Sequence, residues 1–151
     1  MVRSPNYATD GTIFLVTDSG GIFKTANRGD TYTNLTIPMD GIAGSQPDTE
    51  VRCMGISNNY NEVTGTNGTA TKTLFAGSAN NFYRSTDGGV TWAAITWPFD
   101  PDPNSQGVHT LAVAPNFSSS NLLIVGGRSE GYFRYNASTG ARLALAPQGS
   151  G

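Results

Sequence analysis

Residues 85–92 read Ser-Thr-Asp-Gly-Gly-Val-Thr-Trp, and this stretch decides the fold. Two consecutive glycines, Gly88 and Gly89, can adopt the positive φ angles that a sharp chain reversal needs. Asp87 can turn its carboxylate back onto the backbone N–H groups of the same turn, as aspartates do in Asx turns. Trp92 then places a large apolar ring into the layer beneath. The stretch therefore predicts a tight turn between two β-strands, fastened by its own side chains.

The same turn recurs along the chain, 60 residues before and 50 residues after this copy, and such a recurrence indicates a repeat protein. Residues 25–32 keep the pattern, with an asparagine in place of the aspartate and a tyrosine in place of the tryptophan. Residues 135–142 form a third, degraded copy. The residues expected to hold the two better turns together are Ser85, Asp87, Gly89, Thr91 and Trp92 in one, and Thr25, Asn27, Gly29, Thr31 and Tyr32 in the other.

Short apolar runs accompany each turn, and they repeat as well. Residues 51–60 align with residues 108–117 without a gap, and residues 4–7 match the end of both. Because these runs are bounded by Gly, Asn, Asp and Pro, each is typical of a β-strand. The remaining strands are expected at 12–17, 73–77 and 122–126, then at 21–25, 81–85 and 131–135, and last at 33–37, 93–97 and 142–146.

The chain is therefore expected to be all-β, with three four-stranded antiparallel units at about 1–37, 51–97 and 108–146 and a flexible tail at 147–151. The first unit lacks most of its first strand. Four short strands per repeat indicate the blades of a β-propeller, which typically needs about four to eight blades to close. We therefore expect half of a six-bladed ring, completed either by a second copy in a homo-oligomer or by the remainder of a longer chain.

The Ser-x-Asp-x-Gly-x-Thr-Trp pattern of residues 85–92 resembles the Asp-box of BNR-repeat β-propellers. That family includes sialidases, sortilin-type receptor domains, xyloglucanases and photosystem assembly factors. Residues 4–15 also resemble repeats in bacterial proteins of this kind. The resemblance implies that the box lies at the rim between the third and fourth strands, fastens one blade to the next, and is remote from any ligand site.

Composition excludes several classes of function. The net charge is −2 and the nine basic residues are scattered, which argues against a nucleic-acid groove. No apolar run is long enough to span a membrane. Cys53 is the single cysteine, so it can form neither an intrachain disulfide nor a cysteine-based metal site, and a buried, inert thiol is expected. Residues 1–5 do not read as a signal peptide, but we expect an extracellular or periplasmic protein.

Two matching linkers, residues 37–40 and 97–100, lead into long loops, where propellers usually bind ligands. Trp97 and Phe99 can form an aromatic platform for a sugar ring, or can seal two adjacent blades. Asp100 and Asp102 can hold Ca²⁺, or can belong to a proline-stiffened turn without metal or other cofactor. A second candidate pair for ligand binding, Arg52 and His109, begins two first strands at equivalent positions.

Glycosidase chemistry needs two carboxyl groups, and the clustered candidates are Asp40, Asp100 and Asp102. The arginines do not form the triad of an active sialidase, and Arg84, Arg134 and Lys24 share one repeat position that we interpret as a blade-surface cation. The leading hypothesis is a non-catalytic β-propeller module that acts in self-assembly and in protein or glycan recognition. One alternative is a fragment of a carbohydrate-active propeller enzyme, and another is an assembly factor that binds a protein partner.

Overall fold

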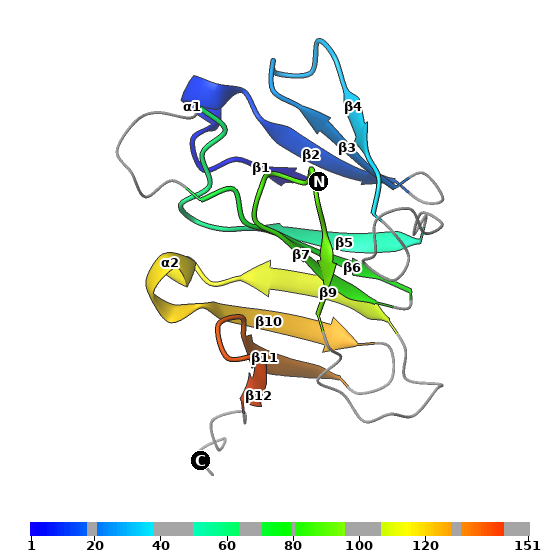
Figure 1. The fold of residues 1–151 in the computed structure, drawn as a ribbon, viewed down its shortest axis with the longest axis vertical. Helices are drawn as coiled ribbons and strands as arrows, with labels where there is room; N and C mark the ends of the chain where they lie inside the picture. Colours follow the sequence, from blue (N-terminus) through cyan, green and yellow to red (C-terminus); the bar gives the residue numbers. More distant parts are fainter. Residues whose placement is uncertain are drawn as a thin grey trace, which may run out of the picture.

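Three four-stranded antiparallel sheets make up the described part of the chain, with the strands of each sheet neighbouring one another in sequence order. The computed structural model describes residues 1–17, 21–37, 50–63, 71–79, 81–95, 107–127 and 131–143. Figure 1 shows the sheets stacked along the long axis of the molecule, from the N-terminal sheet to the C-terminal one. The chain is thus nearly all β, and its sheets are the blades of a partial propeller, as the repeat predicts.

The strands follow the predicted pattern closely. The first sheet contains β1 (Val2–Arg3), β2 (Ile13–Thr17), β3 (Gly21–Thr25) and β4 (Thr33–Leu35). The second contains β5 (Val51–Ile56), β6 (Leu74–Ser78), β7 (Phe82–Ser85) and β8 (Ala93–Ala94). The third contains β9 (Val108–Val113), β10 (Leu122–Gly127), β11 (Tyr132–Asn136) and β12 (Ala141–Leu143). Each fourth strand is shorter than predicted within the described residues.

Two helical turns, α1 (Tyr7–Asp10) and α2 (Phe117–Ser120), join the first and second strands of the outer sheets, and neither is predicted from the sequence. Each has four residues, too few for a helical repeat of apolar side chains to appear in the sequence. Each ends at a residue in the left-handed conformation, Gly11 at φ 61° and Asn121 at φ 52°. Such a residue stops a helix and redirects the chain into the next strand.

The core consists of two apolar layers, one between each pair of neighbouring sheets. The first layer includes Phe14 and Ile22 from the first sheet and Leu74 and Tyr83 from the second. In the second layer Phe75 and Phe82 of the second sheet meet apolar residues of the third. The middle sheet is therefore buried on both faces, and every residue of β6 is buried. No helix among the described residues is long and apolar enough to cross a membrane.

The turn at residues 85–92 is fastened as predicted. The Asp87 carboxylate accepts the backbone N–H of Thr91 at 2.9 Å and its hydroxyl at 2.5 Å. The Ser85 hydroxyl donates to the same carboxylate at 2.8 Å and accepts the N–H of Gly89 at 2.8 Å. Trp92 donates its indole N–H to the Gly89 carbonyl at 3.1 Å and is 5% exposed, packed in the first apolar layer. The polar groups of the turn thus bond to one another, and the Trp92 ring packs against the preceding sheet.

The turn at residues 25–32 keeps most of these hydrogen bonds with asparagine in place of aspartate, but here Asn27 donates its amide to the Thr31 hydroxyl, at 2.8 Å. Thr25 donates its hydroxyl to Asn27 at 2.8 Å, and Asn27 accepts the N–H of Thr31 at 3.0 Å. Tyr32, however, is 47% exposed, whereas its counterpart in the second turn is buried. In the third copy Asn136 still accepts the N–H groups of Ser138 and Thr139.

The interpretation of the shared cation as a blade-surface residue is wrong for Lys24 and Arg84. Lys24 lies 5.7 Å above the centre of the Phe14 ring, and its side chain is 15% exposed. Arg84 lies 5.9 Å from the Phe75 ring centre and donates to the carbonyl of Ala137, in the next sheet, at 3.4 Å. Both cations sit between sheets because their long apolar stems cover aromatic rings while their charged ends reach the neighbouring blade.

Candidate ligand-binding site

Arg52 and His109 lie at equivalent places near the beginnings of β5 and β9, and each is the extra residue of a β-bulge. Along β5 the pairing with β6 shifts between Val51 and Cys53, which leaves Arg52 without a partner in the register. Along β9 the same shift falls between Val108 and Thr110 and leaves His109 unmatched. A bulge re-aims the side chain of its extra residue and is common beside functional sites.

The bulge also explains how a charged residue fits between buried neighbours. Val51 belongs to the first apolar layer, whereas Cys53 packs against the second. Residues two apart in a regular strand face the same side, so the extra residue is what sends these two in opposite directions. Arg52 is released from both layers and is exposed.

The two bulged residues meet. Arg52 Nη1 lies 2.6 Å from His109 Nε2, and Arg52 Nη2 lies 3.8 Å from a Glu50 carboxylate oxygen. Because a guanidinium can only donate, Nε2 is the acceptor of this hydrogen bond. Glu50, Arg52 and His109 thus form an exposed row of a carboxylate, a guanidinium and an imidazole, which we call the first-strand cluster.

The first-strand cluster can bind a polar ligand. It combines hydrogen-bond donors with a carboxylate acceptor, and a sugar hydroxyl or a ligand carboxylate needs such partners. The first strands of the second and third sheets, β5 and β9, contact one another, so residues from two blades contribute to one site.

Five predicted site residues lie outside the described part of the chain: Asp40, Trp97, Phe99, Asp100 and Asp102. The chain connects both of their segments to the first-strand cluster. Residues 38–49 end immediately before Glu50, and residues 96–106 end three residues before His109. The carboxylates, the aromatic pair and the calcium site therefore stay predictions. Among the described residues, no three metal-ligating side chains gather.

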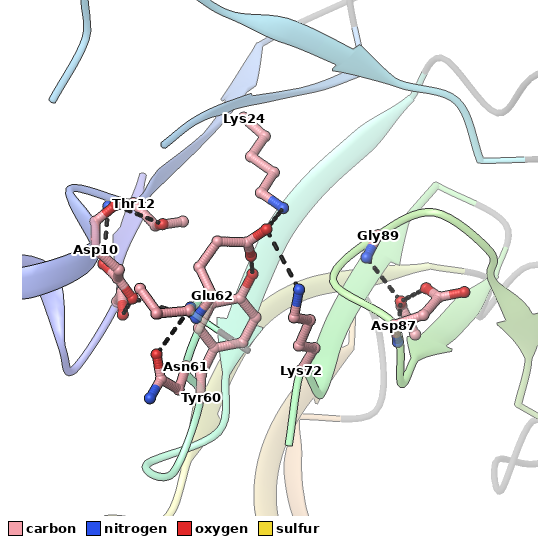
Figure 2. Close-up of polar contacts among 12 residues, drawn as sticks. Asp10, Thr12, Lys24, Tyr60, Asn61, Glu62, Lys72, Asp87 and Gly89 are labelled. Atoms are coloured by element: carbon pink, nitrogen blue, oxygen red, sulfur yellow. Dashed lines mark hydrogen bonds and ion pairs between the residues drawn. The ribbon is translucent and has the colours of Figure 1, made fainter. Parts of the chain in front are cut away.

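A second polar cluster lies at the opposite ends of the strands, beside the turn at residues 25–32. Figure 2 shows Lys24 and Lys72 reaching Glu62 from two sides, at 2.8 Å and 3.5 Å. The Tyr60 hydroxyl donates to the other oxygen of the same carboxylate at 2.5 Å. We call Lys24, Tyr60, Glu62 and Lys72 the interblade ion cluster. Two of its members, Lys24 and Glu62, line an open pocket of about 390 Å³ between the first two sheets.

In this ion cluster, the charges of Lys24 and Lys72 compensate the charge of the partly buried Glu62 carboxylate. Burial by itself raises the pKa of the Glu62 carboxyl, but the hydrogen bonds and charges of Lys24, Tyr60 and Lys72 outweigh burial and hold that pKa below its usual value. Burial, followed by the hydrogen bond to Glu62, raises the pKa of the Tyr60 hydroxyl. Because each group in the cluster is already paired, we interpret it as a fastener between blades rather than as a ligand site.

Sequence reasoning missed the members of this ion cluster other than Lys24. Tyr60 is 0% exposed and packs in the first apolar layer. One signal was available, because Tyr60 aligns with Phe117 and with Tyr7 in the repeat. Nothing in the sequence indicates that Glu62 pairs with Lys24.

The inert role predicted for Cys53 fits its surroundings. Cys53 is partly buried, and its thiol points to the Val108 carbonyl at 3.5 Å. Burial raises the pKa of the thiol to about 12, so it stays protonated near neutral pH. A protonated thiol is a poor nucleophile.

Comparison with solved structures places the chain among β-propeller proteins. It aligns with a GH74 enzyme from Niastella koreensis at a TM-score of 0.59 and 22% identity, over 93% of this chain and 20% of that one. It aligns with the GH74 xyloglucanase from Xanthomonas campestris at a TM-score of 0.58 and 16% identity, over 94% of this chain and 22% of that one. The chain thus spans about a fifth of the length of these enzymes.

A propeller of another kind matches equally well. The WD40 repeats of RRP9 align at a TM-score of 0.57 and 16% identity, over 95% of this chain and 36% of that one. No protein-family model and no curated protein matches the sequence. At these identities the comparisons show the β-propeller fold, and the finer assignment to BNR repeats stays a prediction.

Proposed function

We propose that this chain forms blades of a carbohydrate-active β-propeller and that it binds a polysaccharide at the first-strand cluster. The observation that carries the proposal is the contact between Arg52 and His109, two bulged residues from successive blades that meet beside Glu50. The side chains on offer suit sugar hydroxyls, and the aromatic residues of the adjoining linker, Trp97 and Phe99, would supply a stacking surface for a sugar ring.

The similarity to two GH74 enzymes, one of them a xyloglucanase, supports a polysaccharide as the ligand. It favours the carbohydrate-active reading over a module without catalysis, and it makes xyloglucan the first ligand to test. In an enzyme, Asp40, Asp100 and Asp102 would supply the acid and the base. Polysaccharides of this kind lie outside the cytoplasm, so we propose an extracellular or periplasmic location, in keeping with the similarity to an extracellular domain from B. thetaiotaomicron.

Calorimetric titration with xyloglucan oligosaccharides tests the binding site. Arg52→Ala should weaken binding about tenfold or more, because it removes a charged hydrogen-bond donor worth about 1.5–3 kcal/mol. The matched control is Arg28→Ala, which removes a cation at the opposite ends of the strands and should leave affinity unchanged. Equal loss in both variants, or no binding by the wild-type chain to any of a panel of plant and bacterial glycans, would refute the proposal.

Release of reducing sugar separates the enzyme from the binding module. Loss of hydrolysis in Asp40→Ala or Asp100→Ala, with binding retained, is the result expected of a glycoside hydrolase. Binding by the wild-type protein with no turnover would instead favour the non-catalytic module. A protein ligand is the second candidate, to be tested if no glycan binds.

A further inference from the structure

In the first and second sheets, one face packs against the sheet that follows along the chain. Three equivalent residue pairs, one in each sheet, define this face. We call it the leading face. Phe14 pairs with Lys24 in the first sheet, Phe75 with Arg84 in the second, and Ile124 with Arg134 in the third. Phe14 and Phe75 are both 0% exposed, because the leading faces of the first two sheets are each covered by the following sheet.

The leading face of the third sheet is uncovered. Ile124 is 48% exposed, and Tyr132 is 57% exposed at the position that Ile22 and Phe82 occupy in the other sheets. These two counterparts are 0% and 1% exposed. The third sheet thus carries large apolar residues at positions where the chain otherwise buries them.

The opposite, trailing face shows the reverse pattern. Its equivalent pairs are Leu15 with Phe23, Ala76 with Tyr83, and Val125 with Phe133. The four residues of the second and third sheets are at most 1% exposed, whereas Leu15 and Phe23 of the first sheet are only partly buried. Tyr32 adds to this face, being 47% exposed where Trp92 is 5% exposed.

We propose that the leading face of the third sheet binds the trailing face of the first sheet in a second copy of this chain. Both interfaces within the chain pack a leading face on a trailing face, so the two uncovered faces are complementary halves of an interface that the fold already uses twice. The contact is head-to-tail, and such contacts either close into a ring or extend without limit. Two copies give six blades, within the range at which propellers close, whereas three copies would give nine.

The repeat also assigns a polar contact across this interface. Arg84 donates to the carbonyl of Ala137 in the next sheet, and Asn27 is the first-sheet counterpart of Ala137 in the fastened turns. Arg134 holds the position of Arg84. By analogy with Arg84, it would reach the carbonyl of Asn27 in the second copy.

The mass of the purified chain in solution tests the proposal. Sedimentation equilibrium at micromolar concentration should give twice the 15.9 kDa of one chain. Ile124→Glu breaks the leading face and Tyr32→Glu breaks the trailing face, and each should return the mass to a single chain. Val90→Glu is the matched control, since Val90 is 75% exposed on the second fastened turn and belongs to neither face. It should leave the doubled mass unchanged.

Mixing the two face variants tests the head-to-tail geometry. One of the two interfaces in a mixed pair combines two intact faces, so the 1:1 mixture should regain association that neither variant shows alone. Far-UV circular dichroism confirms that each variant is folded. A wild-type mass of one chain, a doubled mass that survives either folded face variant, or a mixture that stays at one chain would overturn the proposal.

Discussion

At the scale of single residues, the fastened turns show that one acceptor side chain can hold eight residues in place. Asp87 and Asn27 occupy the same position and accept equivalent hydrogen bonds from Thr91 and Thr31. Burial alone would raise the pKa of the Asp87 carboxyl, but hydrogen bonds from Thr91 and Ser85 outweigh it and lower that pKa. The carboxylate therefore binds its donors more strongly than an amide, while the geometry of the turn tolerates both.

Replacing Asp87 tests this account. Asp87→Ala should lower the free energy of unfolding by about 0.5–2 kcal/mol, the range for losing a capping side chain that accepts backbone N–H groups. Asp87→Asn should cost less, since Asn27 holds the same turn in the first sheet. Urea denaturation at neutral pH measures both. Asp30→Ala is the control, because Asp30 is exposed and its carboxylate takes no part in the turn; a loss as large as that of Asp87→Ala would contradict the account.

At the scale of elements, glycine sets how closely two blades approach. A Cβ atom on Gly77, in β6, would lie 2.5 Å from Val108 and 2.7 Å from Cys53, so β6 and β9 pack at a distance that only glycine permits. Gly126 holds the same position in the third sheet, where a Cβ would meet the Thr110 side chain of its own sheet. Glycine is therefore needed for the packing of two blades at position 77 but not at position 126.

Alanine at these two glycines should separate the two cases. Gly77→Ala forces β9 away from β6, and overpacking of this kind costs about 1–3 kcal/mol of unfolding free energy. Gly126→Ala should cost less, because the Thr110 side chain can rotate out of the way. Thermal and urea unfolding of the two variants provide the comparison. Equal destabilisation would mean that the cost comes from the strand itself rather than from the neighbouring blade.

The interblade ion cluster makes stability depend on pH. The pKa of Glu62 is lower in the folded chain than its usual value, so the stabilisation is fully present above the ordinary glutamate range and is lost as pH falls through the lowered pKa. Glu62→Gln should cost about 1–2 kcal/mol at neutral pH, and the difference from wild type should shrink as the pH falls through the lowered pKa of Glu62. Urea midpoints at neutral pH and over a series of decreasing acid pH values measure it. Glu50→Gln, which alters a 63% exposed carboxylate, should show no comparable change.

At the scale of the whole molecule, the sequence alone predicts the fold because its signals are local and repeated. The turn residues and the short apolar runs each specify a strand or a reversal, and three copies of the pattern identify blades. The candidate site is different. The repeat places Arg52 and His109 at equivalent positions, but their contact and the bulges beneath them depend on how two sheets stack, and the pairing of Glu62 with Lys24 depends on it too.

Stability should depend on protein concentration if a second copy covers the outer faces. Because only folded chains associate, the thermal midpoint should rise with concentration over about a hundredfold range. Ile124→Glu should flatten this dependence, since it places a charge in the proposed interface, while Val90→Glu should keep it. Differential scanning calorimetry of the three proteins makes the comparison. A wild-type midpoint that is constant with concentration would contradict the dimeric ring.

The bulges in β5 and β9 have a consequence for how such a protein can diversify. Positions 52 and 109 belong to neither apolar layer, because the extra residue of each β-bulge does not pack against a neighbouring sheet. Natural variation or directed evolution can therefore alter the charge and shape presented at this edge without repacking any blade. Each blade with such a bulge brings one more variable position, so a library confined to the extra residues would vary recognition while the scaffold stays constant.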